Sequence, residues 1–179
     1  VDAGLPLRLV FVGKAPLRKG LDRLLRAFRL ARDAGANCTL RIIGCTPDKV
    51  PIELRDLGGV EWRGFIHKQQ DARGYLDAVA DCDVGCLLSH AEAGGMCLRE
   101  FHALGLAVIA PDVGGSPDHV IREAACLVKP EVCDAEIAAL LLCLSRERQQ
   151  VQALRDISWA RRREVLWAHS VAQLSRLWV

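Results

Sequence analysis

Six short segments of this chain are almost continuously apolar, and segments with helical periodicity separate most of them. A strand with one face in water alternates apolar and polar residues, whereas a strand that is buried on both faces is apolar throughout. Helices on both faces of a parallel sheet provide such burial. The pattern therefore predicts an α/β fold with a Rossmann-like, doubly wound parallel sheet. The expected strands are residues 7–13, 38–44, 60–65, 84–89, 107–110 and 126–128.

Helical periodicity is clearest after the first strand, where Leu21, Leu24, Leu25 and Phe28 recur on one face. Similar but weaker patterns separate most of the later strands. The alternation of strand and helix indicates the crossover connections of a parallel sheet. The expected helices span residues 21–34, 71–80, 96–104, 134–146, 149–163 and 170–178.

The last part of the chain has helical periodicity but no strand pattern. We therefore expect a single domain over residues 1–179, with an α/β core over about 1–146. A C-terminal helical segment, residues 147–179, is expected either to cover this core or to reach toward a domain that is missing. Three tryptophans are expected to be packing anchors of this segment, namely Trp159, Trp167 and Trp178.

Composition excludes several classes of protein. The hydrophobic fraction of 51% excludes a disordered chain, and no apolar run reaches the roughly 18 residues that a membrane-spanning helix needs. The formal net charge of +2 argues against a nucleic-acid-binding protein. Four arginines repeat at every third residue of the first expected helix, and we expect them to form a solvated face. They are Arg23, Arg26, Arg29 and Arg32.

The eight cysteines form neither a disulfide framework nor a metal-binding pattern. Most lie inside apolar stretches of a chain that is not small and loop-rich, so we expect core thiols in a reducing cytoplasm. Cys82 and Cys86 are close in sequence but have no matching ligands nearby. Asp81 and Asp83 form a D-x-D sequence at the start of a strand, which is the wrong end for a ligand. We therefore expect them to be structural, and we expect no metal and no cofactor.

Ligands of an open parallel sheet bind beyond the carboxyl ends of its strands, so the loops that follow strands are the candidate sites. The first such loop, residues 13–20, carries Lys14, Arg18 and Lys19. Cations at this edge suit an anion, most simply a phosphate or a diphosphate. The G-x-G-x-x-G motif does not fit, because Ala15 and Arg18 stand at two of its glycine positions. Solvated loop charges are the alternative interpretation.

The loop after the fourth strand leads to two carboxylates eight residues apart. Glu92 lies in the loop, and Glu100 lies one turn into the helix that Met96 begins. Gly94 and Gly95 allow the backbone to approach a ligand closely, and the first amides of the helix favour an anion. Carboxylates accept hydrogen bonds from hydroxyls, so this pair suits a sugar or a ribose. The alternative is a turn-capping Glu92 and a solvated Glu100.

The loop after the fifth strand, residues 111–119, adds Gly114 and Gly115 at the same edge of the sheet. His90 lies at this edge beside Glu92. It is either a sugar contact or acid–base group, or simply a polar loop residue. Three glycine-containing loops at one edge indicate a ligand site more strongly than any one of them.

In this order, the loops resemble the nucleotide-binding half of family 4 glycosyltransferases, which are retaining enzymes of the GT-B fold. The resemblance rests on the segments FVGKAPLRKG, EAGGMCLRE and PDVGGSPDH, supported by VEWRGF, ADCDVGCLLS and the closing helix SVAQLSRLW. It covers nearly the whole chain, and the two glutamates separated by seven residues are its most specific element. The chain differs from the family pattern at Lys14, which replaces an arginine, at Thr46 and at Asp118.

The resemblance implies a role for each matching residue. Lys14 and Lys19 would hold the diphosphate of the donor and neutralise the leaving group. Glu92 would contact the donor sugar, which makes it the expected catalytic residue, and Glu100 would hold the ribose hydroxyls. The other expected substrate-binding residues are Gly13, Ile66 near the base beside Phe65, His90, Gly94, Gly95, Met96 and Cys97, the last four through backbone amides from Gly94 onward.

The resemblance also implies a reaction. The whole enzyme would transfer a hexose from a UDP-, GDP- or ADP-sugar to an acceptor hydroxyl with retention, in the cytoplasm or at the cytoplasmic face of a membrane through a peripheral contact. The acceptor-binding N-terminal half is not in this chain, which begins with valine. We therefore expect a donor-binding domain that is inactive alone. Two alternatives stay open, a non-catalytic nucleotide-sugar-binding module and an epimerase-like enzyme of nucleotide sugars.

Overall fold

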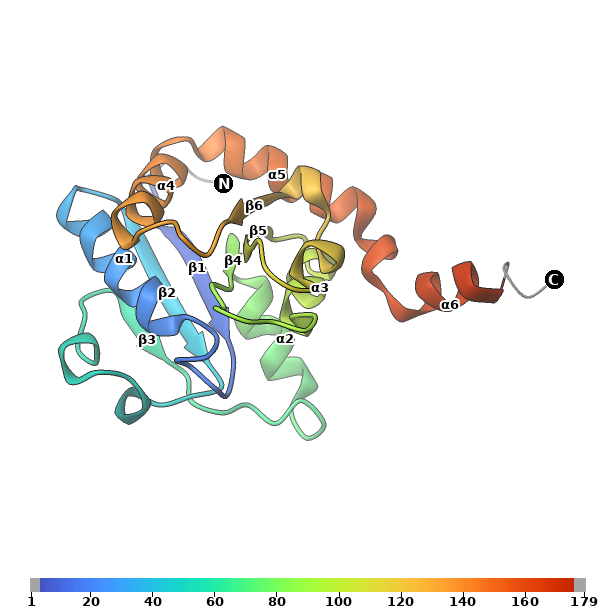
Figure 1. Ribbon diagram of the computed structural model, residues 1–179, viewed down its shortest axis with the longest axis horizontal. Coiled ribbons are helices and arrows are strands. Elements are labelled where there is room, and N and C mark those ends of the chain that lie inside the picture. The colour runs from blue at the N-terminus through green and yellow to red at the C-terminus, as the bar shows by residue number, and fades with distance from the viewer. Residues whose placement is uncertain (1–3, 176–179) are drawn as a thin grey trace.

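The computed structural model describes residues 4–175, which form a six-stranded sheet with helices on both faces (Figure 1). The strand order is β3-β2-β1-β4-β5-β6, and every neighbouring pair is parallel. This is the doubly wound order, so the predicted Rossmann-like α/β fold is confirmed. The strands are β1 (Leu7–Val12), β2 (Cys38–Ile43), β3 (Val60–Trp62), β4 (Val84–Cys86), β5 (Ala107–Pro111) and β6 (Ala125–Val128).

Helices cover both faces of the sheet, and α5 and α6 follow them in the chain (Figure 1). Helices α1 and α4 pack against each other on one face, and α2 and α3 lie on the other. Helix α5 follows α4 in the chain and packs against α3 and β5. Helix α6 projects away from the sheet. The helices are α1 (Leu21–Asp33), α2 (Ala72–Ala80), α3 (Met96–Ala103), α4 (Asp134–Arg146), α5 (Arg148–Arg161) and α6 (Trp167–Ser175).

Short 3-10 helices occupy the connections that the sequence does not resolve into elements. Two lie between β2 and β3, two lie between β5 and β6, and one links α5 to α6. They are η1 (Pro47–Lys49), η2 (Ile52–Leu54), η3 (Ser116–His119), η4 (Arg122–Ala124) and η5 (Arg162–Val165).

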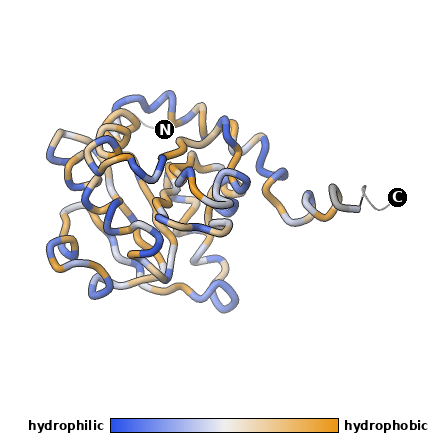
Figure 2. The backbone as a smooth tube through the Cα atoms, viewed as in Figure 1, coloured by the Kyte–Doolittle hydropathy of each residue, from blue (hydrophilic) through white to orange (hydrophobic). Residues whose placement is uncertain are grey.

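The core lies on both faces of the central strands. All five residues of β5 and all three of β4 are buried, as expected for strands that helices cover on both sides. Phe11 of β1, Phe28 of α1 and Phe101 of α3 are among the largest fully buried side chains, and they join the two helical layers to the sheet. Figure 2 shows that the most hydrophilic segments lie in the outer loops and on outer helix surfaces.

β1 and β2 end one residue earlier than predicted, and β3 and β4 end three residues earlier. The two larger differences bear on the site. β4 ends at Cys86 instead of Ser89, because the Leu88 amide donates to the Lys19 carbonyl (3.4 Å) in the loop after β1. β3 ends at Trp62 instead of Phe65, and Gly64 follows it in a left-handed conformation. α6 begins before the expected residue 170, and residues 176–178 of that expected helix lie outside the described residues.

The expectation of a solvated arginine face on α1 is wrong for Arg23 and Arg26, whereas Arg29 and Arg32 are exposed as predicted. Arg23 is buried and donates to the Val132 carbonyl, and Arg26 bonds to Asp134 (2.6 Å) at the start of α4. Arg32 donates to the carbonyl of the first residue of β2 (2.8 Å). These arginines therefore attach α1 to the neighbouring elements.

The expectation that the C-terminal tryptophans are packing anchors is also wrong where it can be tested. Trp159 is 55% exposed and Trp167 is 66% exposed, and Trp178 lies outside the described residues. The guanidinium groups of Arg162 and Arg99 lie 3.8 and 5.4 Å from the ring centroids of Trp159 and Trp167. The two rings are surface partners of arginines.

All eight cysteines are free thiols. The prediction that they are core residues holds for five of them and is wrong for Cys133 and Cys143, which are exposed in and beside α4. Over residues 4–175, no group of three His, Cys, Asp or Glu side chains could hold a metal ion, and no helix is long and apolar enough to cross a membrane. The buried thiols are Cys38, Cys45, Cys82, Cys86 and Cys97.

The D-x-D sequence is structural, as predicted. Asp83 is fully buried at the amino end of β4 and binds arginines from β1 and α5. Asp81 lies on the surface and pairs with Arg8 and Arg41.

Candidate functional site

The sheet changes winding direction between β1 and β4. These strands are neighbours, but the chain leaves β1 toward β2 and leaves β4 toward β5, so the two loops diverge at the carboxyl edge. Such a switch point leaves a crevice that is the usual ligand site of open α/β sheets. The predicted loops, residues 13–20 and 87–95, border this crevice.

An ion pair crosses the crevice between these loops. The Nζ atom of Lys19 lies 3.0 Å from Oε2 of Glu92, and the two side chains are only 16% and 7% exposed. The Ser89 hydroxyl donates to the same carboxylate (3.0 Å), and Arg18 approaches it at 4.0 Å. Glu92 therefore has a fixed position between cationic and hydroxyl donors.

The Glu92 carboxylate is ionised at neutral pH. Burial alone would raise the pKa of Glu92, but the hydrogen bond and the charge of Lys19, with the Ser89 hydrogen bond, outweigh burial and lower it below its ordinary value. An ionised carboxylate is an acceptor of hydrogen bonds, which is the chemistry needed to hold sugar hydroxyls.

Two glycines position Lys19. The added Cβ of any other residue at Gly13 would lie 2.6 Å from Cδ of Lys19, so the missing side chain leaves room for the lysine stem. Gly20 has a φ of 69°, and a Cβ there would lie 2.0 Å from the Leu88 carbonyl oxygen. The backbone of the lysine loop can therefore lie directly against the end of β4.

Lys14 lies on the outer side of the crevice, apart from Lys19. It is exposed, and its Nζ atom lies 4.0 Å from the centroid of the Phe65 ring. Phe65 is half exposed and packs edge-on against His67, with ring centroids 4.8 Å apart. Ile66 is half-buried against the core. The predicted base-binding segment is therefore beside the first predicted phosphate-binding lysine.

The second glutamate has two partners that sequence reasoning misses. The Nζ atom of Lys68 lies 2.5 and 2.7 Å from the two carboxylate oxygens of Glu100, and the Tyr75 hydroxyl donates to Oε2 at 2.5 Å. Ser89 is the third overlooked residue, since it binds Glu92. The only sequence signal for these residues is that Tyr75 is the one tyrosine of the chain and that Ser89 is the last residue of an expected strand.

The two ion pairs are neighbours in space. Cys97 is buried at the start of α3, and burial, together with the charges of Glu100 and Glu92, raises the pKa of its thiol to about 12, although Lys19 and Lys68 act in the opposite direction. All four charged groups therefore lie near this thiol. The Cys97 side chain points into the protein, so only its backbone amide can serve the predicted role.

The third glycine-containing loop, residues 111–119, packs against the backbone of the Glu92 loop. The Gly115 amide donates to the Glu92 carbonyl (3.2 Å), and a Cβ at Gly114 would lie 2.0 Å from that same oxygen. His119 fills the space beside Gly94, where an added Cβ would lie 2.9 Å from its ring. The loop after β5 thus determines where Glu92 lies.

The remaining predicted residues lie at the outer edge of this region. His90 and Met96 are exposed, and Gly95 immediately precedes α3. The structure therefore groups the predicted residues into a Lys19–Glu92 pair, a Lys14–Phe65 cluster and a Glu100 cluster. It shows no contact that assigns a role to His90.

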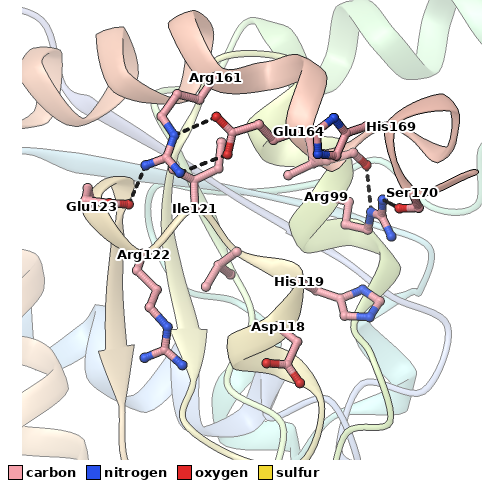
Figure 3. Close-up of a pocket in the computed structure, with 12 residues that line it drawn as sticks. Arg99, Asp118, His119, Ile121, Arg122, Glu123, Arg161, Glu164, His169 and Ser170 are labelled. Atoms are coloured by element: carbon pink, nitrogen blue, oxygen red, sulfur yellow. Dashed lines mark hydrogen bonds and ion pairs between the residues drawn. The ribbon is translucent and has the colours of Figure 1, made fainter. Parts of the chain in front are cut away.

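A cavity of about 430 Å³ lies between η3, η5 and α6, and His119 forms part of its wall (Figure 3). Arg161 lies between Glu123 (2.6 Å) and Glu164 (2.8 Å) on one wall, and Arg99 donates to Ser170 (3.2 Å) on another. None of the predicted site residues lines it, so the crevice at the switch point remains the candidate site.

Comparison with known proteins gives one matching family and one curated relative. Residues 6–146 match the family described as "Glycosyl transferases group 1". The chain is 27% identical over 157 residues to amylovoran biosynthesis glycosyltransferase AmsK of Erwinia amylovora, and this match covers 82% of the chain and 38% of AmsK. The chain therefore spans well under half the length of this relative.

Solved structures of similar fold come from proteins of low sequence identity. Anabaena Alr3699/HepE, solved in complex with UDP and glucose, has a TM-score of 0.75 at 18% identity, with 99% of this chain and 50% of that protein covered. The C-terminal domain of the group 1 glycosyl transferase LpcC of Francisella tularensis has a TM-score of 0.69 at 21% identity, with 87% and 85% covered. The chain thus has the fold of a single domain of such proteins.

Proposed function

The chain belongs to the Glycosyl transferases group 1 family, and we propose that it is the donor-binding half of a retaining GT-B glycosyltransferase. The Lys19–Glu92 pair at the switch point carries this proposal. It places a cation for a diphosphate and a carboxylate for a sugar within hydrogen-bond distance of each other, where a nucleotide sugar would need both. HepE, whose fold is similar, was solved with UDP and glucose bound, which supports a donor of this class.

The proposed reaction transfers a hexose. The bond between the anomeric carbon and the diphosphate breaks, and a bond to the acceptor oxygen forms on the same face of the sugar. The acceptor proton passes to the leaving diphosphate, whose negative charge Lys14 and Lys19 stabilise. Glu92 orients the donor sugar through its hydroxyls, and Glu100 holds the ribose.

The acceptor site is proposed to lie in a second domain. The chain covers 50% of HepE but 85% of the C-terminal domain of LpcC, which supports a separate acceptor-binding half. We propose that the whole enzyme works in the cytoplasm or at the cytoplasmic face of a membrane, and that this chain alone binds the donor without transfer.

The first test is calorimetric titration of the chain with UDP, GDP and ADP. We expect one diphosphate to bind best and Lys19→Ala to weaken it about 10- to 100-fold, because a hydrogen bond to a charged group contributes about 1.5–3 kcal/mol. Lys49→Ala is the matched control, since Lys49 is exposed on η1 and pairs only with its neighbour Asp48. An equal effect of the two variants would contradict a diphosphate site at Lys19.

The second test separates the two glutamates. Glu100→Ala is expected to weaken the diphosphate alone by about tenfold, through loss of the ribose contact. Glu92→Ala should leave diphosphate binding unchanged or stronger, because Lys19 loses its competing partner. It should remove the additional affinity that the sugar of the intact donor provides. Equal losses for both ligands in both variants would refute this division of roles.

A further inference from the structure

The carboxylate of Glu100 has one buried partner and one exposed partner. Tyr75 lies on the inner face of α2 and is only 4% exposed. The Asp71 side chain caps α2 by accepting from the Gly74 amide (2.8 Å), so the helix that carries Tyr75 has a fixed start. The Tyr75 hydroxyl reaches across to α3 and donates to Oε2 of Glu100 at 2.5 Å.

This hydroxyl is a permanent donor. Burial, followed by the hydrogen bond to Glu100 and its negative charge, raises the pKa of Tyr75 far above its ordinary value. The phenol therefore stays protonated at neutral pH. A hydrogen bond from a buried donor to a carboxylate helps to fix the orientation of the acceptor.

Lys68 is the partner of Glu100 that a bound ligand can displace. It lies in the loop before α2, its side chain is half exposed, and its Nζ atom contacts both Glu100 oxygens. It also lies 4.2 Å from the centroid of the Tyr75 ring. An exposed lysine–carboxylate pair contributes little stability, so a ligand can displace this contact at small cost.

A carboxylate offers about four lone-pair positions, and Tyr75 occupies one of them. When Lys68 moves away, the remaining positions can accept two neighbouring hydroxyl groups of a ligand. We propose that Tyr75 is a positioning residue, which orients Glu100 to accept both ribose hydroxyls of the donor nucleotide while Lys68 is displaced. This inference rests on the proposed function, because it takes the donor to be a ribonucleotide.

The test compares ribose with dideoxyribose. Whichever of UDP, GDP and ADP binds the chain best is titrated beside its 2′,3′-dideoxy analogue, which lacks both of the hydroxyls that Glu100 would accept. We expect Tyr75→Phe to weaken the ribonucleotide about 5- to 10-fold and to leave the dideoxynucleotide within about twofold. The preference for ribose should then be nearly lost. Lys68→Ala should leave this preference intact, and the ribonucleotide should bind as well as before or better.

The ratio of the two affinities separates positioning from a merely structural role. A partly unfolded variant weakens both ligands equally, so the ratio is informative even if Tyr75→Phe lowers the melting temperature. In a Glu100→Ala background, Tyr75→Phe should have no further effect on the ratio. An unchanged preference for ribose in Tyr75→Phe would overturn the inference while leaving the proposed function intact. No binding of any diphosphate to the unaltered chain would overturn both.

Discussion

Asp83→Ala is expected to lower the free energy of unfolding by about 3–5 kcal/mol, because removing one partner of a buried ion pair leaves the other charges uncompensated. The Asp83 carboxylate is 0% exposed and binds Arg155 at 2.6 Å, Arg8 at 3.1 Å and Arg148 at 3.4 Å. It also accepts from the Arg8 amide at 3.0 Å. Asp83 thus joins β1, β4 and α5 at the amino edge of the sheet.

Arg148 makes the expected loss large. It is buried, and its Nε and Nη1 atoms have no hydrogen-bond partner within the part of the chain that the structure describes. Asp83 is therefore the group that compensates its charge. Asp81→Ala is the matched control, since Asp81 also pairs with Arg8 (2.7 Å) but is exposed, and its loss should cost less than about 1 kcal/mol. Urea denaturation of both variants measures the difference, and equal losses would contradict the prediction.

The stability that Asp83 contributes should decrease as the pH falls into the acid range. Burial alone would raise the pKa of Asp83, but the hydrogen bonds from Arg8 and the charges of Arg8 and Arg155 outweigh burial and lower it. Its contribution is then fully present above the unfolded carboxyl pKa of about 4 and is lost as pH falls through the lower folded value. The Tm difference between the unaltered chain and Asp83→Asn should shrink in acid, and a growing difference would contradict this assignment.

Gly114→Ala is expected to destabilise the chain by about 2–4 kcal/mol, of which left-handed backbone accounts for about 1–2 and overpacking for the rest. Gly114 has a φ of 55°, and its added Cβ would lie 2.0 Å from the Glu92 carbonyl oxygen. Because that oxygen belongs to the backbone, relief of the contact requires movement of the Glu92 loop. Binding of the intact nucleotide sugar should therefore weaken more than binding of the diphosphate alone.

Gly35→Ala provides the matched control for backbone strain. Gly35 has a φ of 89° after α1, but nothing lies within 4 Å of an added Cβ. The Gly35→Ala variant should lose only about 1–2 kcal/mol of unfolding free energy, and its ligand binding should be unchanged. Thermal melting and calorimetric titration of both variants test the prediction, which would be wrong if the two glycines behaved alike.

The fold follows from the sequence because the central strands are almost continuously apolar, as in LRLVFV, where Arg8 is the one polar residue. The strand ends were less predictable. Leu87 and Leu88 continue the apolar run of β4, but the Leu88 amide turns to the Lys19 carbonyl, a contact that only the assembled sheet creates. The α1 arginines are predicted to be solvated because their spacing shows a helix face. The partners of Arg23 and Arg26, however, lie just before α4 and at its first residue, more than a hundred residues away.

The sequence predicts the edge of the sheet at which the candidate site lies, but not every contact within it. Ligands of open parallel sheets bind beyond the carboxyl ends of the strands, and this rule identifies the loops of Lys19 and Glu92. In the structure, Nζ of Lys19 lies 3.0 Å from Oε2 of Glu92. The partners of Glu100 were not predictable, because Tyr75 and Glu100 meet only through the packing of α2 beside α3. The helical spacing of Tyr75, Ala78 and Val79 identifies Tyr75 as inward-facing but does not identify the group that it meets.

Because five thiols are buried, their rates of alkylation measure how often the protein around them opens. Cys133 and Cys143 are exposed and should be alkylated at once, whereas Cys38 and Cys86 in the sheet can react only after strands separate. Cys97 lies between the two ion pairs of the crevice, with a strongly raised thiol pKa. With the two surface thiols blocked, the alkylation rate of Cys97 records how often the crevice loosens. A bound nucleotide would be visible as slower alkylation of Cys97.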